Sequence, residues 1–281
     1  MVDGSKSIFL SLALPSGWQK ACDKNVLLLW TDVILRSYGQ VLFADNPLTG
    51  FFMILAAGII SHENLFFSFL GAAMASVFAR VLGKDSRYIL HGIFGFTGVM
   101  LGIFWSWYFS LSALSAALFA STVMLAVILQ SAMMKLLSNG RYNLPVMSLP
   151  GALVFILFLY AGYALSSLGV PLPFIASGVQ AAVPPEPEGL FNILMFYNLH
   201  IWGLIFLGIL VNSRISFGSG LFFLAAGFLL TTATPFFSEI NRDLFLGFNV
   251  LPVSIAVFGI FLVATKRAFL YTVLAFFYAR L

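Results

Sequence analysis

The segment 39–50 holds the polar residues whose types and spacing could contact a solute, and it reads GQVLFADNPLTG. Pro47 lacks a backbone N–H, and the residue before a proline avoids helical backbone, so this segment breaks a helix. Asp45 and Asn46 could then cap the helix that follows. The amide of Gln40 both donates and accepts hydrogen bonds, and it is costly in an apolar setting unless it meets partners or water. We therefore expect Gln40 either to line a pore or to bond a neighbouring helix.

A second interrupted segment, 144–150, reads LPVMSLP. Pro145 and Pro150 disrupt a helix within an apolar run and leave backbone carbonyls without helical donors. Ser148 adds a hydroxyl between them. A row of carbonyl and hydroxyl oxygens would suit a solute that offers N–H donors. The same pattern is typical of a helix start with a polar cap, and the sequence leaves both interpretations open.

The remaining chemistry-bearing residues argue against metal binding and catalysis. His62, His91 and His200 form no i, i+4 pair and have no glutamate at metal-ligand spacing, so we assign no metal and no cofactor. The single cysteine, Cys22, excludes an internal disulfide and a thiolate metal cluster. The chain has no HExxH or GxSxG motif, so we predict that it is not an enzyme. A proton-driven pump would need ionisable residues at mid-span, and Asp45 is the only acid in the first polar segment.

The elements that must position these residues are apolar. Of the 281 residues, 61% are hydrophobic and 9% are charged, and the mean hydropathy is +1.02. Soluble domains carry about 25% charged residues, and no soluble core of this length could bury so much apolar surface. We therefore predict an integral membrane protein surrounded by a lipid bilayer. The net charge of +4 comes from basic residues scattered between apolar runs, which indicates membrane flanks rather than a nucleic-acid partner.

The apolar runs predict an all-α membrane protein, because they lack the period-two alternation of a barrel. Short or interrupted runs suggest re-entrant or broken half-helices, which are tolerated where they line a cavity or are buried in protein. The runs are 26–43, 48–61, 65–82, 88–110, 111–134, 144–168, 190–212, 217–233, 244–265 and 268–281, of which 48–61 and 217–233 are the short or interrupted examples.

A proline-rich segment divides the chain into two halves. Residues 169–189 contain five prolines and two glutamates, so we expect them to form a linker in water. The domains are then an N-terminal segment at 1–24, a first transmembrane repeat at 25–168 and a second, incomplete repeat at 190–281. The first residues lack the basic start and long apolar stretch of a signal peptide, so we predict no removable leader.

Similar motifs at a nearly constant spacing indicate that the halves are related. Gly247, in LGFN, follows Gly95, in FGFT, by 152 residues. Gly203 follows Gly50 by 153 residues. Paired repeats with interrupted helices at matching places are typical of transporters, which hold their solute near the bilayer midplane.

A stripe of glycines at helical spacing predicts close packing of helices. It consists of Gly92, Gly95, Gly98 and Gly102. Glycines on one face let two helix backbones approach each other, and we prefer this explanation to a functional one.

These motifs resemble those of the urea transporter family, and they occur in that family's order. The segment 39–50, with GQVLF followed by Asn-Pro and Gly, resembles its half-helix motif. Residues 95–102 resemble its Gly-Tyr-Asn signature helix, with Thr97 in place of the usual asparagine. Residues 144–150 resemble its Leu-Pro-Val-Phe-Thr-x-Pro segment, and LGFN at 246–249 is the main match in the second half.

The resemblance implies a fold, an activity and an assembly. The fold would be two inverted repeats of transmembrane helices, with broken half-helices around a narrow central pore. The activity would be passive, channel-like transport of urea or a similar small neutral amide, without ion coupling. The assembly would be a homotrimer, and we expect a multi-pass protein of the cell membrane, in a bacterial inner membrane.

The resemblance also implies a pore lined by six residues, between which the solute slides edge-on past oxygen acceptors. They are Gln40 at a pore end, Phe43 stacked on the solute, Met100 in place of a pore leucine, Ser148 in place of a central threonine, Phe196 opposite Phe43, and Pro252 in the wall.

The second half departs from the family pattern. Ile193 stands where the family keeps a glutamine or glutamate, and Asn198, Leu199 and His200 replace its Asp-Asn-Pro triplet. The counterpart of Ser148 would lie beyond the last residue, so the second repeat looks truncated or divergent. An alternative is therefore a membrane protein of the same fold that carries another small solute or has a structural role.

Overall fold

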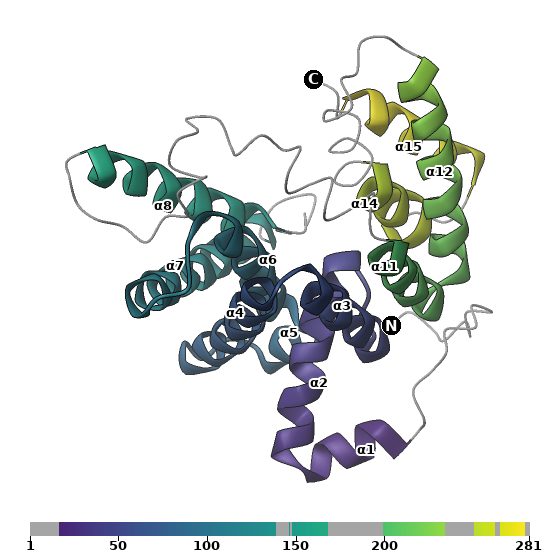
Figure 1. The fold of residues 1–281 in the computed structure, drawn as a ribbon. Helices are drawn as coiled ribbons and strands as arrows, with labels where there is room; N and C mark the ends of the chain where they lie inside the picture. The colour runs from purple at the N-terminus through teal and green to yellow at the C-terminus, as the bar shows by residue number, and fades with distance from the viewer. Residues whose placement is uncertain are drawn as a thin grey trace.

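The structure is a computed structural model that describes residues 17–138, 146, 148–167, 199–233, 250–261 and 265–278 (Figure 1). Within these ranges it is helical and contains no strand, which confirms the all-α prediction. Phe196, the linker at 169–189 and residues 1–16 lie outside the described residues. The elements are α1 (Gly17–Lys24), α2 (Val26–Gly39), the 3-10 turn η1 (Gln40–Leu42), α3 (Pro47–Ile60), α4 (His62–Val81), α5 (Ser86–Leu90), α6 (Ile93–Tyr108), α7 (Ala113–Ser138), α8 (Leu149–Ser167), α11 (Leu199–Asn212), α12 (Arg214–Ala233), α14 (Leu251–Val253), the π-helical segment η4 (Ser254–Phe261) and α15 (Lys266–Tyr278).

The chain breaks between α2 and α3 as the sequence predicts. Phe43 has a left-handed backbone with φ 55°, which ends η1. Asn46 then caps α3, because its side chain accepts a hydrogen bond from the backbone N–H of Leu48, and Pro47 occupies the first turn. The helices on either side of the break, Val26–Leu42 and Pro47–Ile60, are bent by 79°.

The glycine stripe of α6 permits backbone contact with two other helices, which confirms the packing explanation. A Cβ on Gly98 would collide with the carbonyl of Gly71 in α4, and one on Gly102 would collide with the carbonyl of Phe67. A Cβ on Gly95 would collide with Ser37 of α2. Larger residues at these positions would push α6 away from its neighbours.

The largest hydrophobic cluster lies among α4, α6, α7 and α8. Trp105 of α6 is fully buried and stacks on Phe109, with ring centroids 4.0 Å apart. Phe119 of α7 meets both Trp105 and Phe67 of α4. This cluster holds α6 firmly, and α6 in turn carries the predicted pore residue Met100.

The described helices of the second half pack beside the broken pair. Figure 1 shows α11, α12, α14 and α15 grouped together, with α11 next to α3. Thr49 of α3 donates its hydroxyl hydrogen to the carbonyl oxygen of Gly208 in α11 at 2.8 Å. The apolar run at 217–233 belongs to α12, whose apolar part, Arg214–Leu229, is shorter than the candidate membrane spans. The division into two inverted repeats stays a prediction.

The helices place apolar side chains outside and polar ones inside, as a bilayer requires. On α4, Phe66 and Phe69 are exposed, whereas Asn64, Ser68 and Ser76 are fully buried. A soluble helix would show the reverse pattern, because its polar face meets water. Among the described residues, two helices are long and apolar enough to cross a membrane, α4 and Ala113–Leu137 in α7, and the bent pair gives a third if it counts as one span. The protein is therefore a multi-pass membrane protein.

Candidate functional site

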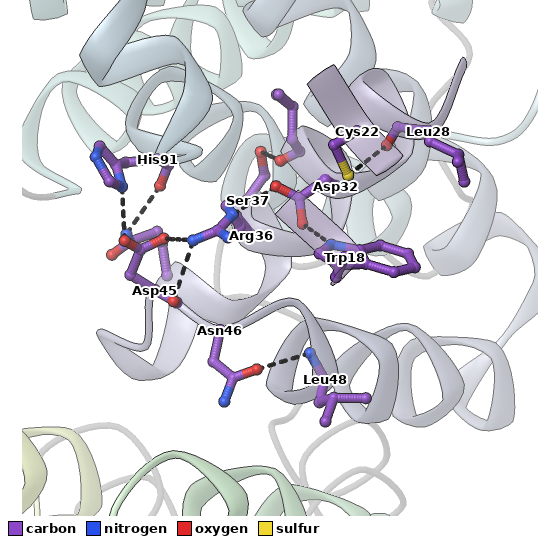
Figure 2. A network of polar contacts seen from close by, with 12 residues as sticks. Trp18, Cys22, Leu28, Asp32, Arg36, Ser37, Asp45, Asn46, Leu48 and His91 are labelled. Carbon is purple, nitrogen blue, oxygen red and sulfur yellow. Dashed lines mark hydrogen bonds and ion pairs between the residues drawn. The ribbon is translucent and has the colours of Figure 1, made fainter. Parts of the chain in front are cut away.

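A network of ion pairs fixes the break between α2 and α3 (Figure 2). The guanidinium of Arg36 reaches Asp32 with Nε at 2.6 Å from Oδ2, and it reaches Asp45 with Nη1 at 2.6 Å from Oδ1. The indole N–H of Trp18 donates to the other oxygen of Asp32 at 2.7 Å. The expectation that Asp45 caps α3 is wrong, because its carboxylate instead pairs with Arg36 and with His91, and Asn46 is the cap.

The same network ties the break to the loop before α6. The Nδ1 atom of His91 lies 2.6 Å from Oδ2 of Asp45. The amide Nε2 of Gln40 donates to the backbone carbonyl of His91 at 2.9 Å. In this loop Asp85 accepts hydrogen bonds from the side chain and the backbone of Arg87, which lower the pKa of that exposed carboxyl. Gln40 is thus held at the N-terminal end of α6.

A cavity of about 130 Å³ lies among α2, α3, α4, α6 and α11. Its walls are mostly apolar and include Met53, Met100, Phe104 and Ile201. A single water molecule needs a cavity of roughly 10–15 Å³, so this cavity has room for a small solute. None of its lining residues carries a charge, so its interior suits a neutral molecule.

Polar side chains from α2 and α4 form a hydrogen-bonded chain against this cavity. Tyr38 and Asn64 both line it. The hydroxyl of Ser68 donates to the carbonyl oxygen of Asn64 at 2.6 Å, so the Tyr38 hydroxyl, 2.6 Å from Ser68 Oγ, must donate to Ser68. Sequence reasoning missed Tyr38 and Asn64. The available signal was a helical stripe of small and polar residues along α4, which continues through Gly71 and Ser76.

The structure places the predicted pore residues apart from one another. Met100 lines the cavity, and Phe43 packs against the apolar cluster that includes Met53 and Ile201 of the cavity wall. Ser148 is exposed at the start of α8, where its carbonyl accepts from the N–H of Ala152 at 3.0 Å. Of the remaining three, Pro252 is partly buried in the first turn of α14, Gln40 belongs to the network around the helix break, and Phe196 lies outside the described residues.

The fold and this site define a helical membrane transport protein with a broken helix beside an uncharged cavity. The chain belongs to the urea transporter family, because the family model described as urea transporter matches residues 31–281. It is 26% identical to urea transporter 1 of Mus musculus, over 91% of this chain and 69% of that protein. It is 27% identical to urea transporter 1 of Rattus norvegicus over the same shares, and 27% identical to that of Capra hircus over 62% of this chain and 43% of the goat protein. The resemblance drawn from the three motifs is thereby confirmed.

Proposed function

We propose that the chain carries urea passively across the membrane and that the cavity beside Met100 is part of the path. The observation that supports this proposal most directly is an uncharged cavity of about 130 Å³ next to the broken helix pair. Urea is small and neutral, so an apolar wall with few polar groups admits it while it excludes ions. Relatives named urea transporter 1 support urea as the solute.

Transport without ion coupling follows from where the charges lie. Asp32, Arg36 and Asp45 pair with one another at the helix break, and the cavity lining contains no charged residue. A coupled transporter needs an ionisable group or ion site along the path. Urea flux into proteoliposomes should therefore persist when proton and sodium gradients are collapsed, and abolition of uptake by an uncoupler would contradict the proposal.

The proposed path uses the residues expected from the sequence. In this proposal Gln40 stands at one end of the path and Met100 in its wall, and Phe43 packs against the apolar cluster beside it. Ser148, Phe196 and Pro252 complete the proposed lining. Substitution of Gln40 by leucine and of Ser148 by valine tests two of these roles, since each deletes an oxygen while it roughly keeps the shape. Normal urea flux in both variants would remove these residues from the path.

The decisive experiment fills the cavity. Met100→Trp should cut urea flux at least tenfold in stopped-flow measurements on proteoliposomes, because the larger side chain occupies the space that the solute needs. Met124→Trp is the matched control, since Met124 is 47% exposed on α7 and should leave flux unchanged. Equal urea flux in Met100→Trp and the parent protein would show that the cavity is not on the path.

Two finer assignments also stay predictions. The homotrimer would use some of the exposed apolar surface of the helices as subunit contacts, and chemical cross-linking in membranes tests it. The bacterial inner membrane is the expected location, although the relatives named above are mammalian. Fractionation of the source cells would test that location.

A further inference from the structure

The hydroxyl of Thr49 crosses from one helix to another. Two other fully buried threonines, Thr122 and Thr272, each donate to the carbonyl four residues earlier in their own helix, at 2.8 Å and 2.9 Å. Thr49 is equally buried, but its Oγ1 atom donates from α3 to the carbonyl of Gly208 in α11 at 2.8 Å. This hydrogen bond therefore joins a helix of the first half of the chain to a helix of the second half.

The position of Thr49 at the start of α3 explains this difference. A threonine inside a helix commonly bonds the carbonyl four residues back. For Thr49 that carbonyl belongs to Asp45, which precedes the helix and accepts instead from Nη1 of Arg36 at 3.3 Å. A buried hydroxyl needs a partner. Because α3 has no carbonyl four residues before Thr49, the hydroxyl bonds the carbonyl that α11 presents.

The bond lies one helical turn from the cavity on both helices. Met53 follows Thr49 by four residues on α3, and Ile205 precedes Gly208 by three residues on α11. Residues at these spacings share one face of a helix. Met53 and Ile205 both line the cavity. The cavity therefore continues along the seam between α3 and α11 from the point where Thr49 joins the two helices.

The residue after Thr49 fixes the other side of α3. A Cβ on Gly50 would collide with the carbonyl of Leu35 in α2, so α3 has no room to move toward α2. On the α11 side the contact is looser, because a Cβ on Gly208 would lie 3.4 Å from Cγ2 of Thr49, which is van der Waals contact without overlap. The spacing of α3 and α11 at this point therefore depends on the hydrogen bond more than on backbone contact.

We propose that Thr49 is a positioning residue that sets the distance between α3 and α11, and thereby limits the size of the amide that passes through the cavity. This inference rests on the proposed urea path. Thr49 is not among the residues that line the cavity, so it acts through Met53 and Ile205. The separation of these two side chains follows the separation of their helix backbones. Without the hydrogen bond, the cavity widens and admits bulkier solutes.

The test compares stopped-flow fluxes of urea and of the bulkier N,N′-dimethylurea in proteoliposomes. Thr49→Val keeps the shape of the side chain and deletes the hydroxyl. Because hydrogen bonds between membrane helices contribute modestly, we expect about a threefold rise in the ratio of dimethylurea flux to urea flux. Thr49→Ser retains the hydroxyl and should keep the parent ratio. Thr122→Val is the matched control, because it deletes an equally buried hydroxyl that bonds within α7 and does not line the cavity.

The outcomes separate this inference from the urea path itself. A raised ratio in Thr49→Val, with parent ratios in Thr49→Ser and Thr122→Val, supports the proposal. An unchanged ratio in Thr49→Val overturns it, and Met100→Trp then shows separately whether the path through the cavity stands. The same rise in Thr49→Ser or in Thr122→Val also overturns it, because the interhelical hydroxyl would then have no special role. If Thr49→Val aggregates in size-exclusion chromatography, Thr49→Ala deletes the same hydroxyl and is judged by the same outcomes.

Discussion

The two ends of α6 differ in the charge and the burial of the polar side chains that surround them. At its N-terminal end, Oδ2 of Asp45 lies 2.6 Å from Nδ1 of His91, and these two side chains are 41% and 56% exposed. At its C-terminal end, Asn64 is fully buried and its amide meets only the neutral hydroxyl of Ser106. The carboxylate of Asp45 is thus kept where water can reach it, whereas the uncharged amide of Asn64 is placed in the interior. The charged end thus holds the helix break in place, while the neutral end joins two helices through a buried hydrogen bond.

The largest expected effect comes from removing the cation of the charged end. Arg36→Met would leave Asp32 without its ion-pair partner, and both side chains are largely buried, at 15% and 10% exposure. Breaking such a pair destabilises proteins by about 3–5 kcal/mol. Thermal unfolding in detergent should show a clear fall in melting temperature. Arg87→Met, in the exposed pair with Asp85, is the control and should change little.

A moderate effect is expected at the neutral end. Ser106→Ala deletes the acceptor of Asn64 Nδ2 and leaves the amide free to flip. We expect about 1–3 kcal/mol of destabilisation, measured by thermal unfolding. Ser121→Ala is the control, because Ser121 also bonds a carbonyl three residues back but is exposed. If Ser106→Ala and Ser121→Ala behave alike, the neutral end has no special role.

A smaller effect is expected from neutralising Asp45. Asp45→Asn keeps the shape and weakens two contacts, to Arg36 and to His91. Partly exposed pairs contribute about 0–1 kcal/mol, so stability should fall by no more than about 1 kcal/mol. The difference from the parent protein should shrink in 1 M salt, which screens exposed charges. A salt-independent loss would show that this end is less open to water than its exposure indicates.

The smallest effect is expected for His91→Asn. Gln40 bonds the backbone carbonyl of His91, which the substitution retains. The side chain is exposed, so stability should change by less than about 0.5 kcal/mol and urea flux should stay normal. Gln40→Leu serves as the comparison in the same flux assay. A loss in His91→Asn as large as that in Gln40→Leu would place the imidazole in the path.

Local features of the fold could be predicted from the sequence. Pro47 and Asn46 signal a helix break and cap within a few residues, and the structure has both. The glycines of α6 follow a simple helical spacing, so their role in helix packing can also be predicted from the sequence. These signals work because each depends on short-range backbone chemistry.

Long-range contacts could not be predicted in the same way. The Asp45–His91 contact joins residues 46 positions apart, and nothing in the local pattern favours it over capping by Asp45. Asn64 looks like an ordinary first-turn residue in the sequence. Its buried hydrogen bond depends on a hydroxyl 42 positions away. Only the packed structure brings these groups together.

The backbone contact of α4 and α6 has a consequence for how fast the solute moves. Gly71 and Gly98 bring the two main chains together, and a side chain at either position would collide with the carbonyl of the other. We therefore expect the part of the cavity wall that carries Met100 to be rigid. A rigid wall leaves the stripping of water from the solute as the main barrier, with no rocking step to wait for. The conductance should then respond smoothly to temperature, without the break that a slow conformational change would introduce.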